Sequence, residues 1–81
     1  MEKEQILEKV KQVVSDVLGV SVEQIAPESE FIADLGAESI QSLELVAAFE
    51  EEFDIEMDEE VALQVQNVGD AVTFISKYLG S

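Results

Sequence analysis

The stretch Asp34-Leu35-Gly36-Ala37-Glu38-Ser39-Ile40-Gln41-Ser42-Leu43-Glu44-Leu45 is the most informative part of this chain. It places a glycine-containing turn before a serine and then continues as an apolar, acidic run with helical spacing. We therefore expect a helix that starts at Ser39 and ends near Phe53. Ser39 is then expected at an accessible junction between a loop and a helix.

The helix expected over residues 39–53 carries more apolar side chains than one buried stripe needs. The set that fits a core-facing stripe is Ser42, Leu45, Val46, Phe49 and Phe53. A second apolar set falls on a different side, close to two of the acids, and consists of Ile40, Leu43 and Ala47 with Glu44 and Glu51. An apolar strip edged by carboxylates suits a transient protein partner. The alternative is a helix buried almost all round, and its four glutamates argue against that.

Ser39 itself has two interpretations. A serine at a helix start commonly caps free backbone N–H groups with its hydroxyl. The same N–H groups and the helix dipole also favour an anion, so a phosphodiester on the Ser39 hydroxyl would be stabilised there. Glu38 is expected to help a modifying enzyme bind or hold its magnesium ion, or alternatively to complement the helix dipole.

The rest of the chain predicts three more helices and no strand. Apolar residues at helical spacing predict a helix over about residues 3–18 that stops at Gly19. A short helix is expected over 59–65 after Asp58, and Asn67 is expected to cap a last helix. The fold class is therefore all-α, with three main helices and one short helix around a single core.

A long first loop, residues 19–38, connects the first two helices. Residues 21–24 have capping-box spacing and predict a single helical turn within it. The apolar residues expected to anchor the loop to the core are Val20, Val22, Ile25, Phe31, Ile32 and Leu35.

The charge balance excludes several kinds of partner. The chain has 19 acidic residues, four lysines and no arginine or histidine, for a formal net charge of −15. Such a field repels nucleic acid and anionic membrane surfaces and attracts basic protein patches and divalent cations. No signal peptide or membrane span is visible, so a cytoplasmic location is expected.

Two other functional classes fit less well. An enzyme is disfavoured because the chain has no histidine, cysteine or arginine to act as general base or oxyanion clamp. Residues 54–60 alternate acids as a cation loop does, but they lack the mid-loop glycine and the ligand spacing of an EF-hand. We expect no dedicated metal site, only weak cation binding between the second and third helices.

The residues quoted so far resemble those of acyl carrier proteins. Residues 34–45 resemble the prosthetic-group attachment site of that family. Residues 25–36 resemble its first loop, 44–53 its acidic recognition helix and 67–72 the start of its last helix. The resemblance extends from about Ile6 to Tyr78.

The resemblance implies a single acyl carrier domain over residues 1–81, folded as an acyl-carrier-type four-helix bundle. Ser39 maps onto the attachment serine for 4′-phosphopantetheine, which a phosphopantetheinyl transferase takes from coenzyme A. The chain would then carry acyl groups as thioesters, catalyse nothing itself and act as a monomer. Its implied partners are acyltransferases, ketosynthases, reductases and dehydratases of fatty acid, polyketide or lipid biosynthesis, with no nucleic acid and no membrane insertion.

The resemblance also implies roles for two sets of side chains. The partner-binding set is Glu38, Ile40, Leu43, Glu44, Ala47 and Glu51. The set expected to line an acyl cavity is Val46, Phe49, Phe53, Val61, Ala62 and Ile75.

Some residues depart from the usual family pattern. Glu38 replaces the common aspartate, Ile40 replaces leucine, and Gln41 stands where an acid is common. These changes favour a specialised carrier. The alternatives are an acidic protein-interaction module of carrier fold that is never primed, and a carrier for a dedicated nonribosomal or polyketide pathway.

Overall fold

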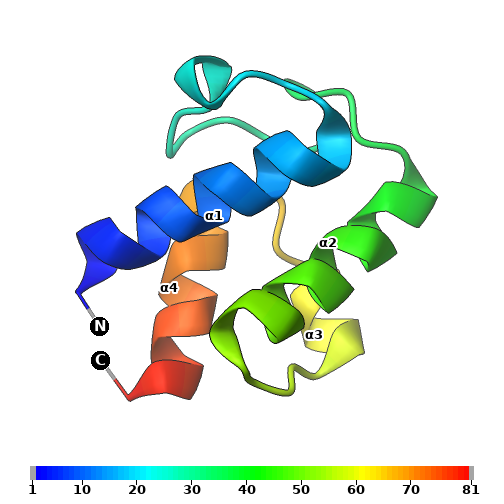
Figure 1. Cartoon of the computed structure of the whole chain (residues 1–81). Helices are drawn as coiled ribbons and strands as arrows, with labels where there is room; N and C mark the ends of the chain where they lie inside the picture. The colour runs from blue at the N-terminus through cyan, green and yellow to red at the C-terminus, as the bar shows by residue number, and fades with distance from the viewer. Residues whose placement is uncertain (1, 81) are drawn as a thin grey trace.

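A computed structural model describes residues 2–80, and within them the chain is helical. The elements in chain order are α1 (Lys3–Leu18), the 3-10 turn η1 (Val22–Gln24), α2 (Ser39–Phe53), α3 (Glu59–Ala62) and α4 (Val68–Leu79). Residues 2–80 form no strand, only one isolated antiparallel bridge between Glu30 and Asn67. The all-α prediction of three main helices and one short helix is confirmed (Figure 1). None of the helices between residues 2 and 80 has the length and apolar character needed to cross a membrane.

The helix ends follow the capping residues in the sequence. Gly19 adopts the left-handed conformation that closes α1, and its N–H donates to the Ser15 carbonyl at 2.9 Å. The Asp58 side chain accepts from the Glu60 N–H at 3.1 Å, and Asn67 Oδ1 accepts from the Asp70 N–H at 2.8 Å. Both predicted caps are therefore confirmed, as is the single turn at η1.

The predicted end of the third helix at Val65 is wrong, because α3 already stops at Ala62. The Gln64 and Val65 N–H groups bond only three residues back, which tightens the chain into a turn. The Gln66 carbonyl then accepts from the Phe31 N–H at 3.0 Å. The chain leaves the helix early because it pairs with the first loop.

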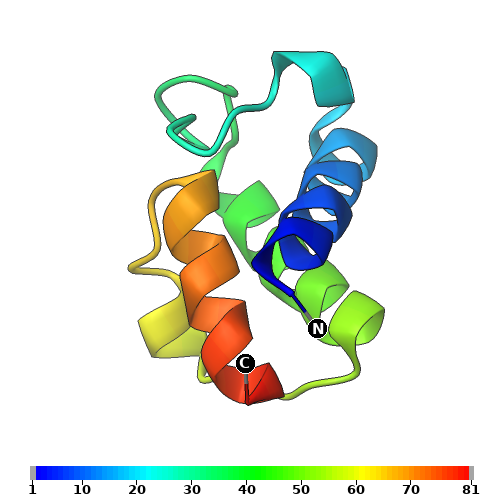
Figure 2. The same cartoon turned by 90° about the vertical axis from the view of Figure 1, so that its left-hand side faces the viewer.

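The three main helices enclose the core, and α3 lies on the side of the molecule away from α1 (Figures 1 and 2). The largest fully buried side chains come from α1 and α4 and are Ile6, Val10, Val14, Val68 and Ile75. Helix α2 adds Leu45, Phe49 and Phe53 to the same cluster. One hydrophobic core thus fixes α2 against α1 and α4.

The first loop is held in place by hydrogen bonds to the start of α4. The Gly69 N–H donates to the Pro27 carbonyl at 2.7 Å, and the Val68 N–H donates to the Ser29 carbonyl at 3.0 Å. Ile25 and Phe31 are buried as expected, whereas the expected anchor Ile32 is 63% exposed. The loop therefore presents Ile32 to solvent while it delivers the chain to α2.

Candidate functional site at the start of α2

The turn before α2 depends on Gly36 and Ala37. Gly36 has a φ of 73°, a left-handed conformation that glycine adopts without strain. The next residue, Ala37, is buried, and its N–H donates to the Phe31 carbonyl at 2.8 Å. These two residues fix the point at which the chain enters α2.

Ser39 is the first residue of α2 and is exposed. Its hydroxyl makes no hydrogen bond with any residue between 2 and 80. The N-cap is Glu38 instead, and the Glu38 N–H donates to Gln41 Oε1 at 2.8 Å in a capping-box arrangement. The alternative that Ser39 serves as the helix cap is therefore wrong, and its hydroxyl is accessible for modification.

Sequence reasoning missed the structural role of Gln41. The signal was present, because an acid at position 38 and a glutamine three residues later have capping-box spacing. Gln41 accepts the hydrogen bond of the Glu38 N–H without adding a negative charge beside Ser39.

Helix α2 separates its side chains into two faces, as predicted. Leu45, Val46, Phe49 and Phe53 are buried, and Ser42 is half-buried. The other face exposes Ile40 by 63% and Leu43 by 42%, together with Ala47, Glu44 and Glu51. The alternative of a helix buried almost all round is wrong, and an apolar strip edged by carboxylates faces solvent.

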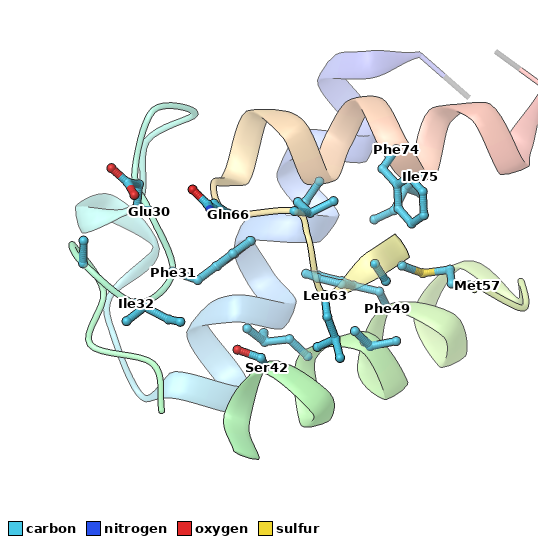
Figure 3. A pocket seen from close by; sticks show the side chains of 16 residues that line it. Glu30, Phe31, Ile32, Ser42, Phe49, Met57, Leu63, Gln66, Phe74 and Ile75 are labelled. Atoms are coloured by element: carbon cyan, nitrogen blue, oxygen red, sulfur yellow. The ribbon is translucent and has the colours of Figure 1, made fainter. Parts of the chain in front are cut away.

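A cavity of about 310 Å³ lies beside the buried face of α2 (Figure 3). Side chains from α2, the α3 region, α4 and the first loop surround it. Four of the six residues suggested from the sequence line it: Val46, Phe49, Ala62 and Ile75. The residues that sequence reasoning missed include Phe31, Met57, Leu63, Val65, Ala71 and Phe74.

Phe53 and Val61 do not line this cavity, which corrects the sequence-based set. Phe53 lies one helical turn beyond Phe49 and is buried in the main core. Val61 is 45% exposed because it points away from the face of α3 that buries Ala62. No pattern within a four-residue helix could reveal which of two neighbouring residues faces inward.

The cavity comes close to the start of α2. Ser42 lines it and lies three residues after Ser39, so the two side chains are neighbours on the helix surface. Ile32 and Leu63 also line the cavity although they are 63% and 43% exposed, so they form its rim. Figure 3 shows Ser42 on α2 between these two side chains. An exposed serine hydroxyl one turn from an apolar cavity fits a prosthetic group that carries an apolar chain.

The surroundings of the site are acidic. Glu38, Glu44 and Glu51 are exposed, and no lysine or arginine occurs between Gln12 and Ser76. Among the residues that the structure describes, no three histidine, cysteine or acidic side chains are grouped to hold a metal ion. Weak cation binding between α2 and α3 stays a prediction.

Comparisons with known proteins agree with this geometry. A family model described as a phosphopantetheine attachment site matches residues 8–75. An acyl carrier protein from a Picosynechococcus species is 44% identical over 78 residues, which cover 96% of both chains. The acyl carrier protein of Clostridium acetobutylicum is 49% identical, covering 90% of this chain and 95% of its own, and that of Phenylobacterium zucineum is 47% identical, covering 94% and 96%. These matches support the carrier interpretation and not that of a module that is never primed. The chain belongs to the acyl carrier protein family, whose cofactor is a covalently attached 4′-phosphopantetheine.

Proposed function

We propose that Ser39 is the attachment site and that residues 1–81 act as one carrier domain for acyl groups. The observation that carries this proposal is the exposed Ser39 hydroxyl, which the Glu38–Gln41 pair releases from any capping role. Once attached, the phosphopantetheine group supplies the thiol that holds acyl chains as thioesters.

The start of α2 suits the phosphate of the attached group. The first N–H groups of a helix lack backbone partners, and the helix dipole favours an anion at this end. Ser39 is the first helical residue, so a phosphodiester on its hydroxyl would lie within this field. The exposed position of Ser39 also leaves the hydroxyl open to a transferase.

We assign the cavity to the carried acyl chain. Its side walls are apolar, from Val46 and Phe49 on α2 and from Ala62 and Ile75 on the opposite side. Burial of methylene groups is favourable by about 0.8 kcal/mol each, so an alkyl chain gains by entering. Shelter from water would also slow hydrolysis of the thioester.

We assign the exposed face of α2 to partner enzymes. Glu38, Glu44 and Glu51 would steer encounter with basic patches, while Ile40, Leu43 and Ala47 offer a small apolar contact. The partners that we expect at this face are a phosphopantetheinyl transferase and the acyltransferases, ketosynthases and other acyl-processing enzymes of fatty acid biosynthesis that carry basic patches. These enzymes supply the catalytic groups, since this chain has no histidine, cysteine or arginine.

The direct test is the intact mass after incubation with coenzyme A, magnesium and a broad-specificity phosphopantetheinyl transferase. The wild-type chain should gain a single phosphopantetheine group, and Ser39→Ala should gain none. Ser42→Ala is the matched control, one turn further along α2, and should gain the group as the wild type does. A gain by Ser39→Ala, or none by the wild type, would overturn the assignment.

A further inference from the structure

One wall of the cavity is formed by a short segment of the chain that contains α3 and the irregular residues on either side of it. This wall segment, residues 56–65, contributes Met57, Ala62, Leu63 and Val65 to the lining. Within it, α3 has only four residues, and Val61 and Leu63 are each more than 40% exposed. A helix this short with so little buried apolar surface is marginal by itself. Other contacts must therefore keep the wall segment in place.

The residues that directly follow the wall segment are held by backbone hydrogen bonds. The Phe31 N–H donates to the Gln66 carbonyl at 3.0 Å, and the Val68 N–H donates to the Ser29 carbonyl at the same distance. These bonds join the segment to the first loop, which lines the same cavity through Phe31. Both bonds join backbone atoms, so no side chain takes part in them.

The N-terminal end is held by two side chains from different helices. The Met57 N–H donates to Glu50 Oε2 on α2 at 2.8 Å, and the Asp58 N–H donates to the Tyr78 hydroxyl on α4 at 3.2 Å. The Tyr78 ring is itself positioned by an edge-to-face contact with Phe74, whose ring centroid is 5.2 Å away. Because Met57 and Phe74 both line the cavity, these contacts connect its wall to α2 and α4.

We propose that Glu50 and Tyr78 are positioning residues that hold the wall segment closed and so determine how well the cavity shelters an acyl chain. The inference rests on the proposed function, because it takes the acyl chain as the occupant of the cavity. Neither residue lies on the exposed α2 strip assigned to partners, and Tyr78 is on a different helix. The effect of Glu50 and Tyr78 on the wall segment can therefore be measured separately from the docking of partner enzymes on α2.

The first test is native-state hydrogen exchange of the unmodified chain. Glu50→Met removes the acceptor at nearly constant length, whereas Glu50→Gln removes the charge but keeps an acceptor oxygen. Tyr78→Phe removes only the hydroxyl. The reporters are the Ala62 and Leu63 amides, which donate to the Asp58 and Glu59 backbone carbonyls and not to either substituted side chain.

Loss of one hydrogen bond should speed exchange of these reporters roughly fivefold in Glu50→Met and in Tyr78→Phe. Glu50→Gln and a charge control on the same segment, Glu56→Gln, should stay near the wild type. Amides of Val10 and Val14 in α1 should not change, which separates local opening from global unfolding. Equal exchange in all variants would overturn the proposal, as would equal acceleration in Glu56→Gln.

The second test uses the same variants loaded with an octanoyl thioester. Cleavage of this thioester by hydroxylamine should be severalfold faster in Glu50→Met and Tyr78→Phe than in the wild type and in Glu50→Gln. Faster exchange without faster cleavage would refute the link between the wall segment and the acyl chain. If the wild-type chain accepts no phosphopantetheine, the proposed function fails, and the exchange experiment still decides whether the two side chains hold the wall.

Discussion

The Ser39 hydroxyl is accessible for modification because two neighbouring residues, and not Ser39, form the hydrogen-bonded start of α2. Glu38 occupies the N-cap position, and Gln41 Oε1 accepts a hydrogen bond from the Glu38 N–H at 2.8 Å. The spacing of these two residues was readable from the sequence, whereas the freedom of the Ser39 hydroxyl followed only from the geometry. At the scale of single residues, the sequence predicts that Ser39 is the candidate attachment residue, and the structure explains why its hydroxyl is accessible.

Gln41→Ala tests the capping pair. The substitution removes the acceptor for the Glu38 N–H, so the free energy of unfolding should fall by about 1 kcal/mol in urea denaturation. Gln41→Glu keeps an acceptor oxygen and should retain most of the stability, although it adds a negative charge. If both variants lose the same amount, the hydrogen bond is not what stabilises the start of α2.

At the scale of elements, hydrophobic periodicity predicted α1 and α2 at the bounds that the structure shows. Their bounds depend on local patterns such as Gly19 at the end of α1. The end of α3 was not predictable in this way, because pairing of Gln66 with Phe31 joins segments far apart in the sequence. The same limit explains the errors at Phe53 and Val61. The residues that enclose a cavity are determined by how the helices pack against one another, and the sequence pattern of a single helix does not contain that information.

The exposed strip of α2 predicts a charge-dependent encounter with partners. Glu44→Lys should slow priming by a phosphopantetheinyl transferase severalfold at low salt, through a lower rate of association. The difference from wild type should shrink as salt is added, because exposed charges are screened. Glu8→Lys on α1 makes the same charge change on another element and should have little effect. An equal loss in both variants would point to net charge and not to a docking surface.

Because Ala62 lines the cavity and Val61 does not, we expect substitutions at these two adjacent residues of α3 to differ in their effect on cleavage of a bound acyl thioester. Ala62→Leu places a larger side chain in the cavity, so it should leave priming at Ser39 unchanged while an octanoyl thioester becomes easier to cleave. Val61→Leu makes a smaller change on the exposed side and should leave cleavage as in the wild type. Hydroxylamine cleavage followed by mass spectrometry checks both. Identical cleavage rates in the two variants would contradict the assignment of the cavity to the acyl chain.

At the scale of the whole molecule, repulsion among acids opposes the hydrophobic core. The net charge is −15, and within residues 2–80 the one ion pair is Lys9–Glu52, at 3.2 Å and with both side chains more than 40% exposed. An exposed pair of this kind contributes about 0–1 kcal/mol. The hydrophobic core therefore has to stabilise the fold against repulsion among the acidic side chains, which no other ion pair within residues 2–80 reduces.

This balance predicts that salt stabilises the fold. Raising sodium chloride from about 0.01 M to about 1 M shortens the screening length from ~30 Å to ~3 Å, which weakens the repulsion. The urea midpoint should rise over this range, with only a small opposing effect from screening of Lys9–Glu52. A constant or falling midpoint would show that repulsion among the acids does not limit stability.

The central claim is that Ser39, and no other residue, carries the phosphopantetheine group. Trypsin cannot isolate the site, because no lysine or arginine lies between Gln12 and Ser76, but cleavage after glutamate releases the peptide from Ser39 to Glu44. That peptide contains Ser39 and Ser42, so fragmentation by tandem mass spectrometry distinguishes them. We predict that primed protein yields this peptide with the group on Ser39. A group on Ser42, or an unmodified peptide from primed protein, would contradict the account.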